Sequence, residues 1–367
     1  MASRRLKGSV TVAAPTPYEV LVEPDLDLTQ AVSDALPPGT AVLLTDSTVG
    51  PLYAPFVLEA LKEAGWALAD VVTVPAGEES KSLSVYEGVV RGLARAGGPR
   101  GGTLFALGGG VVGDLGGFVA SSYMRGINLV QLPTSLLAMV DSSVGGKVGL
   151  DLPEGKNLIG AFLQPRLVAA NLDWLETLPP REVSHGLAEV VKMGLLSGGK
   201  FFEALGRLKE ARAGDKDALQ ALILHSVRAK AAVVAEDERE TGLRAILNYG
   251  HTVGHGLEAA AGYDLPHGEA VAAGMLAAAR LSGELLGTTD LLEIHESLLH
   301  AAGLPLKAPA LDVESVLRAM GRDKKRHASD QAHTYRFVLL EDVGRPRRDV
   351  PVEEAEARRA IGAVLGP

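Results

Sequence analysis

The stretch Thr103-Leu-Phe-Ala-Leu-Gly-Gly-Gly-Val-Val-Gly-Asp114 is the most informative one for the fold. An apolar run that favours a β-strand, Thr103–Leu107, leads directly into glycines at 108, 110 and 113, the spacing G-x-G-x-x-G. Without side chains, such a loop lets backbone N–H groups approach a pyrophosphate at the N-terminus of the next helix. A glycine-rich turn that only connects tightly packed elements remains the alternative. The dinucleotide fingerprint is also incomplete, because no acidic residue follows about 20 positions later to bind a ribose. Asp46, after an earlier strand, is a candidate for that role.

The first half of the chain alternates such strands with helical patterns. The predicted strands are Ala41–Thr45, Val71–Val74, Thr103–Leu107 and Asn128–Leu132, and helical patterns cover Tyr53–Ala64 and Ser84–Ala96. This alternation predicts an α/β fold, with a mostly parallel sheet in a first domain over residues 1–178.

Beyond the pair Pro179-Pro180, apolar helical patterns follow one another and strands nearly vanish. Proline fits the first turn of a helix and restrains the residue before it, so the pair is a natural boundary. The sequence predicts an all-helical second domain over residues 179–367, with one possible strand at Thr334–Leu340. The predicted helices are Arg181–Leu196, Lys216–Glu236, His251–Ala261, Gly268–Leu286 and Leu291–Ala302.

Composition excludes several classes of function. The chain has 367 residues, a formal net charge of −9 and no cysteine. Thiolate catalysis and disulfides are therefore excluded, and any zinc ion would need His, Asp or Glu ligands. The negative charge argues against nucleic-acid or anionic membrane partners. With neither a signal-peptide pattern nor about 18 consecutive apolar residues, the expected location is the cytoplasm.

Histidine and glutamate residues cluster in the second half. His251 and His255 lie four apart on one face of a predicted helix, and His267 follows just before the next helix. Glu189 lies in an apolar helical stretch, where a carboxylate is costly unless it is paired or bound to a metal. One glutamate and two histidines would leave a zinc ion an open position for catalysis. Spacing alone does not select the two histidines, and each could instead cap a helix or form a core hydrogen bond.

Cations lie beside glycines in this acidic chain. Lys147 follows Gly145-Gly146, and Lys156 follows Gly155. Backbone N–H groups and ammonium groups together can surround a phosphate or a carboxylate. A small, multiply charged anionic substrate is therefore expected.

Taken together, several blocks resemble the 3-dehydroquinate synthase family. They run in order from about Asp46 to Lys325: Pro75–Ser82, Gly108–Asp114, Gly116–Gly126, Leu132–Lys147, Gly155–Asn157, Leu178–Glu182, Gly186–Lys192 and Asn248–His255. The resemblance implies an NAD-binding α/β domain, a helical metal-binding domain and a homodimer.

The resemblance also implies roles for individual residues. The metal, Zn²⁺ or Co²⁺, would be bound by Glu189, His251 and His267. NAD would be held by Asp46, Glu78, Lys81, Gly109, Gly110, Val111, Val112, Gly113, Asp114, Thr134, Ser135, Lys147, Lys156, Trp174, Leu175, Glu176 and Thr177. The sugar phosphate substrate would contact Arg125, Asp141, Lys147, Asn157, Lys192, Lys230, Arg244, Asn248, His255 and one of Lys324 and Lys325.

The implied activity belongs to the shikimate pathway of aromatic amino acid biosynthesis. Transient oxidation by NAD, phosphate elimination, reduction and an intramolecular aldol closure would convert 3-deoxy-D-arabino-heptulosonate 7-phosphate into 3-dehydroquinate. Three alternatives stay open: a sister sugar phosphate cyclase, a polyol dehydrogenase of the glycerol dehydrogenase type, and a binding protein without activity. Asn157 together with His255 favours the dehydroquinate reaction.

Overall fold

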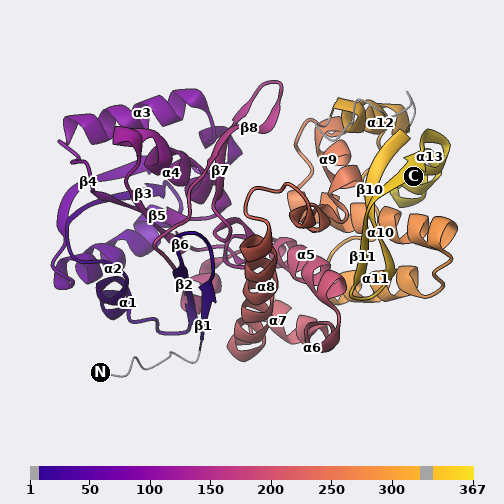
Figure 1. Ribbon diagram of the computed structural model, residues 1–367, viewed down its shortest axis with the longest axis horizontal. Coiled ribbons are helices and arrows are strands. Elements are labelled where there is room, and N and C mark those ends of the chain that lie inside the picture. The colour runs from indigo at the N-terminus through magenta and orange to yellow at the C-terminus, as the bar shows by residue number, and fades with distance from the viewer. Residues whose placement is uncertain (1–7, 323–333) are drawn as a thin grey trace. The chain divides into compact units, whose positions relative to one another are not determined.

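The computed structural model describes residues 8–322 and 334–367. These residues form two compact units (Figure 1). The first holds the residues up to Leu178 together with Ser226–Arg239, and the second holds Pro179–His225 together with the residues from Glu240 onward. The segment Ser226–Arg239 therefore belongs to the first unit, although it lies far from the rest of that unit in sequence.

The first unit is built on a seven-stranded sheet with the order β1-β2-β9-β6-β5-β3-β4. Its strands are β1 Ser9–Val12, β2 Tyr18–Glu23, β3 Thr40–Asp46, β4 Ala67–Val74, β5 Thr103–Gly108, β6 Asn128–Pro133 and β9 Leu167–Asn171. Only the β1–β2 pairing is antiparallel among the described strands of this sheet. The expected α/β fold with a mostly parallel sheet is confirmed.

Helices cover both faces of this sheet. They are α1 Leu28–Ala35, α2 Val49–Glu63, α3 Leu83–Arg95 and α4 Gly110–Ser122. Because side chains alternate along a strand, Leu43 packs into the core formed with α1 and α2, and Val42 and Leu44 pack into the core formed with α3 and α4. Strands buried on both faces read as continuous apolar runs, and this explains why β3, β5 and β6 were predicted from sequence.

The chain order of the strands creates a switch point. After β3 the chain passes through α2 to the edge strand β4, and it then returns to place β5 on the other side of β3. In open parallel sheets, ligands bind outside the carboxyl ends of the strands at such a point. The loops after β3 and β5 flank it.

A separate antiparallel hairpin follows β6. It consists of β7 Lys147–Leu152 and β8 Gly155–Phe162. Sequence patterns did not reveal it, since its glycines interrupt the apolar alternation. The hairpin carries Lys147, Lys156 and Asn157.

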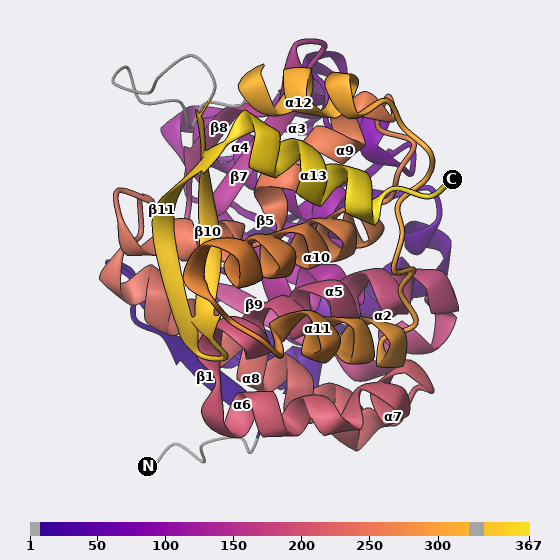
Figure 2. The same ribbon diagram turned by 90° about the vertical axis from the view of Figure 1, so that its right-hand side faces the viewer.

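Among its described residues, the second unit is helical apart from one hairpin. Its helices are α5 Pro180–Ser197, α6 Gly199–Ala204, α7 Leu208–Arg212, α9 His251–Ala260, α10 His267–Leu286, α11 Leu291–Ala301, α12 Val313–Arg322 and α13 Glu354–Val364. The hairpin pairs β10 Thr334–Asp342 with β11 Arg345–Glu353, so the single strand expected here has a partner. Figure 2 shows α10 running across this unit, and it packs against α5, α9, α11, α13 and β10.

Helix α8, Lys216–Glu236, belongs partly to each unit. By length and composition it is the one described helix that could cross a membrane, with a mean hydropathy of 1.3 over its most apolar window. About half of that window, 56%, is buried within the protein. Core helices commonly pass the same test, so this finding is weak evidence for a membrane span.

Candidate active site

Residues predicted to bind NAD follow the carboxyl ends of four parallel strands. Asp46 ends β3, Gly109–Asp114 follows β5, Thr134 and Ser135 follow β6, and Trp174–Thr177 lies in the 3-10 turns after β9. The carboxyl ends of parallel strands meet at one edge of a sheet, where dinucleotides bind in this class of fold. The fold thus collects a set that is scattered along 132 positions of sequence.

The glycines after β5 are held close to other backbone and side chains. A Cβ atom at Gly109 would lie 3.3 Å from Ser135 Oγ, and one at Gly110 would lie 3.0 Å from Ser142 Oγ. At Gly113 it would lie 2.9 Å from Gln131 Oε1. A side chain at these positions would therefore collide with its neighbours, so glycine is needed for packing as well as for the close approach of a ligand to the backbone. Gly109 caps α4 without a side-chain hydrogen bond, so the first N–H groups of this helix can face an anion.

Asp46 is partly engaged in the turn that it begins. Its Oδ1 accepts hydrogen bonds from the backbone N–H groups of Thr48 and Val49, both at 2.8 Å. These bonds fix the carboxylate at the start of α2, beside the glycine loop in the sheet order. The arrangement suits the predicted ribose contact.

Lys81 organises a cluster of acidic groups in the first unit. Its Nζ lies 2.9 Å from Asp114 Oδ2, 3.4 Å from Glu78 Oε1 and 3.9 Å from Asp151 Oδ1, and it donates a 2.7 Å hydrogen bond to Asn157 Oδ1. Burial alone would lower the pKa of Lys81, but the surrounding carboxylates outweigh burial and raise it. Sequence reasoning placed Lys81 with NAD and Asn157 with the substrate; the structure joins them directly. It missed Asp151.

The turn after β9 borders a hollow of about 330 Å³ in the first unit. Tyr53 lines this hollow and donates a 3.1 Å hydrogen bond to the Trp174 carbonyl, and its hydroxyl lies 2.6 Å from Thr177 Oγ1. The lining residues are Asp25, Leu26, Tyr53, Phe56, Asn171, Asp173 and Trp174. Two carboxylates in this wall make it a poor place for a phosphate.

Lys230 and Asp141, both expected to touch substrate, pair in the first unit. Lys230 Nζ donates to the Asp141 carbonyl at 2.8 Å and forms an ion pair with its carboxylate. Asp141 lies in a π-helical turn, Ala138–Ser142, and such turns are frequent at functional sites. Lys230 comes from the part of α8 that joins this unit.

In the second unit, Glu189 on α5, His251 at the start of α9 and His267 at the start of α10 converge. Their nearest ligand atoms all lie within 4.8 Å of one another. Glu189 Oε1 lies 3.6 Å from His251 Nε2 and 3.5 Å from His267 Nε2. A second group, His255, Glu258 and His267, meets the same distance criterion and shares His267.

The donor set of the first group fits a divalent ion. Oxygen and nitrogen ligands about 2.0–2.2 Å from a tetrahedral Zn²⁺ lie roughly 3.4 Å apart, close to the two oxygen–nitrogen distances observed. Both oxygens of Glu189 are buried without a well-directed hydrogen bond from residues 8–322 or 334–367. Lys192 forms an ion pair with its Oε2. A fully buried carboxylate in this position would gain a partner from a metal ion.

Charges in this group shift its titration. Burial would raise the pKa of Glu189, but the charges of Lys192 and of His267, 3.5 Å away, lower it to about 2. Burial would lower the pKa of His267, yet Glu189 and Glu258 raise it to about 10. The pKa of His251 falls well below its ordinary range through burial and the nearby Lys192 charge.

His255, Asn248 and Arg244 are the remaining predicted substrate residues of this unit. The His255 ring lies 5.2 Å from that of His251, centroid to centroid. Asn248 Nδ2 donates a 2.8 Å hydrogen bond to Glu240 Oε1, a carboxylate that sequence reasoning missed. Arg244, in the same 3-10 turn as Asn248, is almost fully buried.

A further expected substrate contact, Arg125, lies in the 3-10 turn that follows α4. Arg125 and its neighbour Met124 have φ values of 69° and 53°, so this turn is strained in the way seen at functional sites. Lys324 and Lys325 lie outside the described residues.

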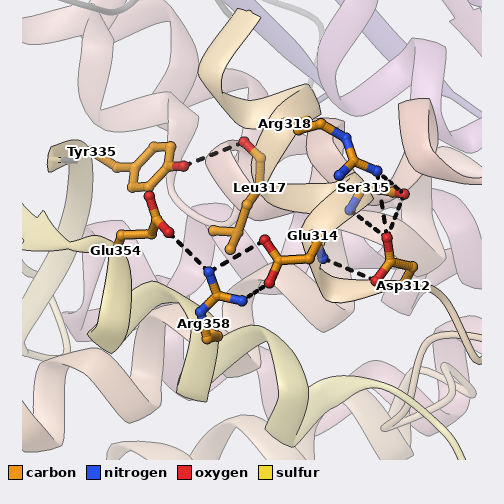
Figure 3. Close-up of polar contacts among 8 residues, drawn as sticks. All are labelled: Asp312, Glu314, Ser315, Leu317, Arg318, Tyr335, Glu354 and Arg358. Carbon is orange, nitrogen blue, oxygen red and sulfur yellow. Dashed lines mark hydrogen bonds and ion pairs between the residues drawn. The ribbon is translucent and has the colours of Figure 1, made fainter. Parts of the chain in front are cut away.

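Helix α12, Val313–Arg322, makes polar contacts at its start and with α13 (Figure 3). Asp312 Oδ2 accepts a 3.0 Å hydrogen bond from the Ser315 N–H at its start, and Arg358 of α13 pairs with Glu314 and Glu354.

Two family models match the chain. A model of the 3-dehydroquinate synthase N-terminal domain covers residues 71–185, and one of the C-terminal domain covers residues 186–326. A 3-dehydroquinate synthase of Xylella fastidiosa is 45% identical over 364 residues, which span 96% of this chain and 97% of the relative. One of Acidithiobacillus ferrooxidans is 49% identical over 317 residues, spanning 84% and 85%.

Solved structures show the same fold. A 2-deoxy-scyllo-inosose synthase complexed with carbaglucose-6-phosphate, NAD⁺ and Co²⁺ superposes with a TM-score of 0.88 at 28% identity, covering 97% of this chain and 100% of the other. A 2-epi-5-epi-valiolone synthase from Streptomyces hygroscopicus subsp. jinggangensis with NAD⁺ and Zn²⁺ bound has a TM-score of 0.82 at 26% identity, covering 95% and 96%. A Schizosaccharomyces pombe glycerol dehydrogenase, at 18% identity and a TM-score of 0.66 over 94% and 88%, shares the fold alone.

Proposed function

This chain belongs to the 3-dehydroquinate synthase family, and from that premise we propose that it converts 3-deoxy-D-arabino-heptulosonate 7-phosphate into 3-dehydroquinate and phosphate. The observation that carries the proposal is the meeting of Glu189, His251 and His267 in a chain that also bears the glycine loop after β5. The first set supplies a metal site with an open position, and the second supplies a site for a dinucleotide.

The two cofactors would be held by different compact units. We assign NAD to the residues after β3, β5, β6 and β9 in the first unit, and Zn²⁺ or Co²⁺ to the histidine group in the second. When bound, NAD takes up a hydride and returns it, and the metal ion acidifies a substrate hydroxyl. The reaction is therefore a lyase reaction without net oxidation.

The chain's own residues bind and orient the anionic substrate. Lys147, Lys192, Lys230, Arg125 and Arg244 are cations suited to phosphate and carboxylate. Holding both groups in one pose lowers the entropic cost of each later step. Lys192 and Lys230 already pair with carboxylates, Glu189 and Asp141, so their ammonium groups are positioned before substrate arrives.

Proton handling falls to His255 and Asn157. His255 is exposed, so a substrate can reach its ring. The ring also packs edge-to-face against that of His251. Asn157 has its carbonyl oxygen fixed by Lys81, which leaves its amide N–H groups to donate. Such positioned groups act as general acids, bases or hydrogen-bond donors.

The test is phosphate release by the purified protein from 3-deoxy-D-arabino-heptulosonate 7-phosphate, with catalytic NAD and Zn²⁺ or Co²⁺. We expect stoichiometric phosphate without accumulation of NADH. No turnover on this substrate, but turnover on a hexose phosphate, would assign the chain to a sister cyclase. Steady NADH formation with simple polyols would assign it to the dehydrogenases.

We further propose a cytoplasmic homodimer that binds neither nucleic acid nor membranes. The support is the family resemblance together with the net charge of −9. Sedimentation equilibrium of the purified chain would give twice the mass of 38.2 kDa.

A further inference from the structure

The two histidines of the proposed metal group are held in different ways. His251 Nδ1 donates a 3.1 Å hydrogen bond to the Tyr249 carbonyl, which is neutral. His267 Nδ1 instead lies 3.5 Å from Glu258 Oε1, a carboxylate. In both rings this leaves Nε2 on the side of Glu189. Outer partners of this kind fix which nitrogen of an imidazole carries the proton.

Glu258 reaches His267 because of helical geometry. It follows His251 on α9 by seven residues, which is two turns, so the two side chains lie on the same face. That face packs against α10, which begins at His267. Glu258 is only 2% exposed, and a buried carboxylate is costly without a cationic or hydrogen-bonding partner.

The charges of the group favour a second carboxylate. Lys192 already neutralises Glu189 through their buried ion pair. The positive charge of a divalent ion beside that pair would therefore not be compensated by Glu189 in this buried site. Glu258 offsets part of that charge without occupying a position next to Glu189.

We propose, resting on the function proposed above, that Glu258 is the positioning residue of the metal centre: it orients His267 and strengthens metal binding without being a ligand itself. The competing arrangement is the group of His255, Glu258 and His267, in which Glu258 would bind the metal directly.

The experiment is a Co²⁺ titration of the metal-free full-length protein without substrate, followed by the visible absorption spectrum and by competition with a chelator. Glu258→Gln keeps an acceptor for His267 Nδ1, and Glu258→Leu removes the acceptor without leaving a buried charge. We expect roughly 10–100-fold weaker Co²⁺ binding for the leucine variant, a smaller loss for the glutamine variant, and an unchanged band shape for both.

Controls separate the alternatives. Glu284→Gln removes an exposed carboxylate from α10 and leaves Co²⁺ affinity unchanged. His255→Ala keeps Co²⁺ binding if Glu189, His251 and His267 are the ligands, and loses it in the competing arrangement. Thermal melting of each metal-free variant reports folding separately.

Three results would overturn the inference. Equal Co²⁺ affinity in both Glu258 variants and the unsubstituted protein would remove any role in metal binding. A lower melting temperature with unchanged Co²⁺ affinity would make Glu258 purely structural. A changed band shape in the glutamine variant, with loss of binding in His255→Ala, would make Glu258 a ligand. If the unsubstituted protein bound no Co²⁺, the proposed function itself would fail.

Discussion

Gly274 of α10 lies against the backbone of Gly250, so closely that a Cβ atom at Gly274 would meet the Gly250 carbonyl oxygen at 1.9 Å. Gly250 caps α9 in a left-handed conformation, with φ of 78°, and His251 follows it directly. The contact therefore fixes the start of α9 against the helix that begins with His267. Two glycines with no chemistry of their own set the distance between two proposed metal ligands.

The first prediction concerns this contact. Gly274→Ala forces α9 and α10 apart, so we expect it to destabilise the second unit by about 3 kcal/mol and to abolish Co²⁺ binding. Gly362→Ala on α13 is the matched control, because among the described residues the added methyl group meets no atom within 4 Å beyond its chain neighbours and its own helix backbone. It gains helix propensity and stays within about 1 kcal/mol of the unsubstituted protein. Urea unfolding and Co²⁺ titration measure both; normal Co²⁺ binding by Gly274→Ala would contradict the prediction.

The second prediction concerns Lys81, whose side chain is 5% exposed. Lys81→Met leaves three carboxylates facing one another around a buried position. Removing one partner of a buried ion pair costs about 3–5 kcal/mol, and we expect a loss of that size in urea unfolding, with weaker NAD binding by calorimetry. Lys62→Met is the control, because its ion pair with Glu59 is exposed and worth about 0.5 kcal/mol. Equal stability of the two variants would refute the account of this cluster.

Sequence patterns predicted the fold well where burial is continuous. Strands β3, β5 and β6 and helices α8 to α11 were found within a few residues, because apolar periodicity is strong there. β9 was missed because its sequence, Leu-Val-Ala-Ala-Asn, is short and rich in alanine. Helix α2 begins at Val49, earlier than expected, because Pro55 interrupts the pattern without ending the helix.

The candidate site was predictable in its residue types and less so in its contacts. Spacing left open which histidines join Glu189, and only the family resemblance named His251 and His267. Glu258 and Asp151 were missed, since a lone acidic residue in a helix or beside a turn reads as solvated surface. Their burial depends on packing between elements far apart in sequence, which local patterns do not encode.

The third prediction concerns a buried pair behind His251. The Tyr249 hydroxyl lies 2.8 Å from His295 Nε2, and both residues are fully buried. Burial lowers the pKa of His295 to about 4, so the neutral ring accepts this hydrogen bond near pH 7. Tyr249→Phe leaves the acceptor unpaired and should cost about 1–3 kcal/mol.

A double variant tests whether the pair acts as a unit. Adding His295→Leu to Tyr249→Phe removes both polar groups, so we expect the combined loss in urea unfolding to be smaller than the sum of the two single losses. Additive losses would show that the two groups do not interact.

The last prediction concerns pH. In the metal-free protein the pKa of His267 is raised to about 10, so at neutral pH both ring nitrogens are protonated. Glu189 and Glu258 stabilise this positively charged ring. A metal ion needs the neutral ring, so binding must release a proton, and acid must weaken binding. Between pH 6 and 8, below this pKa, we expect Zn²⁺ affinity to rise about tenfold per pH unit. Calorimetry at pH 7.5 in buffers of different ionisation enthalpy should show release of about one proton.

Glu258→Leu lowers the pKa of His267 by removing one of its carboxylate partners, and the proton release at this pH should fall. Zn²⁺ binding that releases no proton in the unsubstituted protein would mean that His267 is already neutral, and that the ion pairs with Glu189 and Glu258 do not hold a charge there.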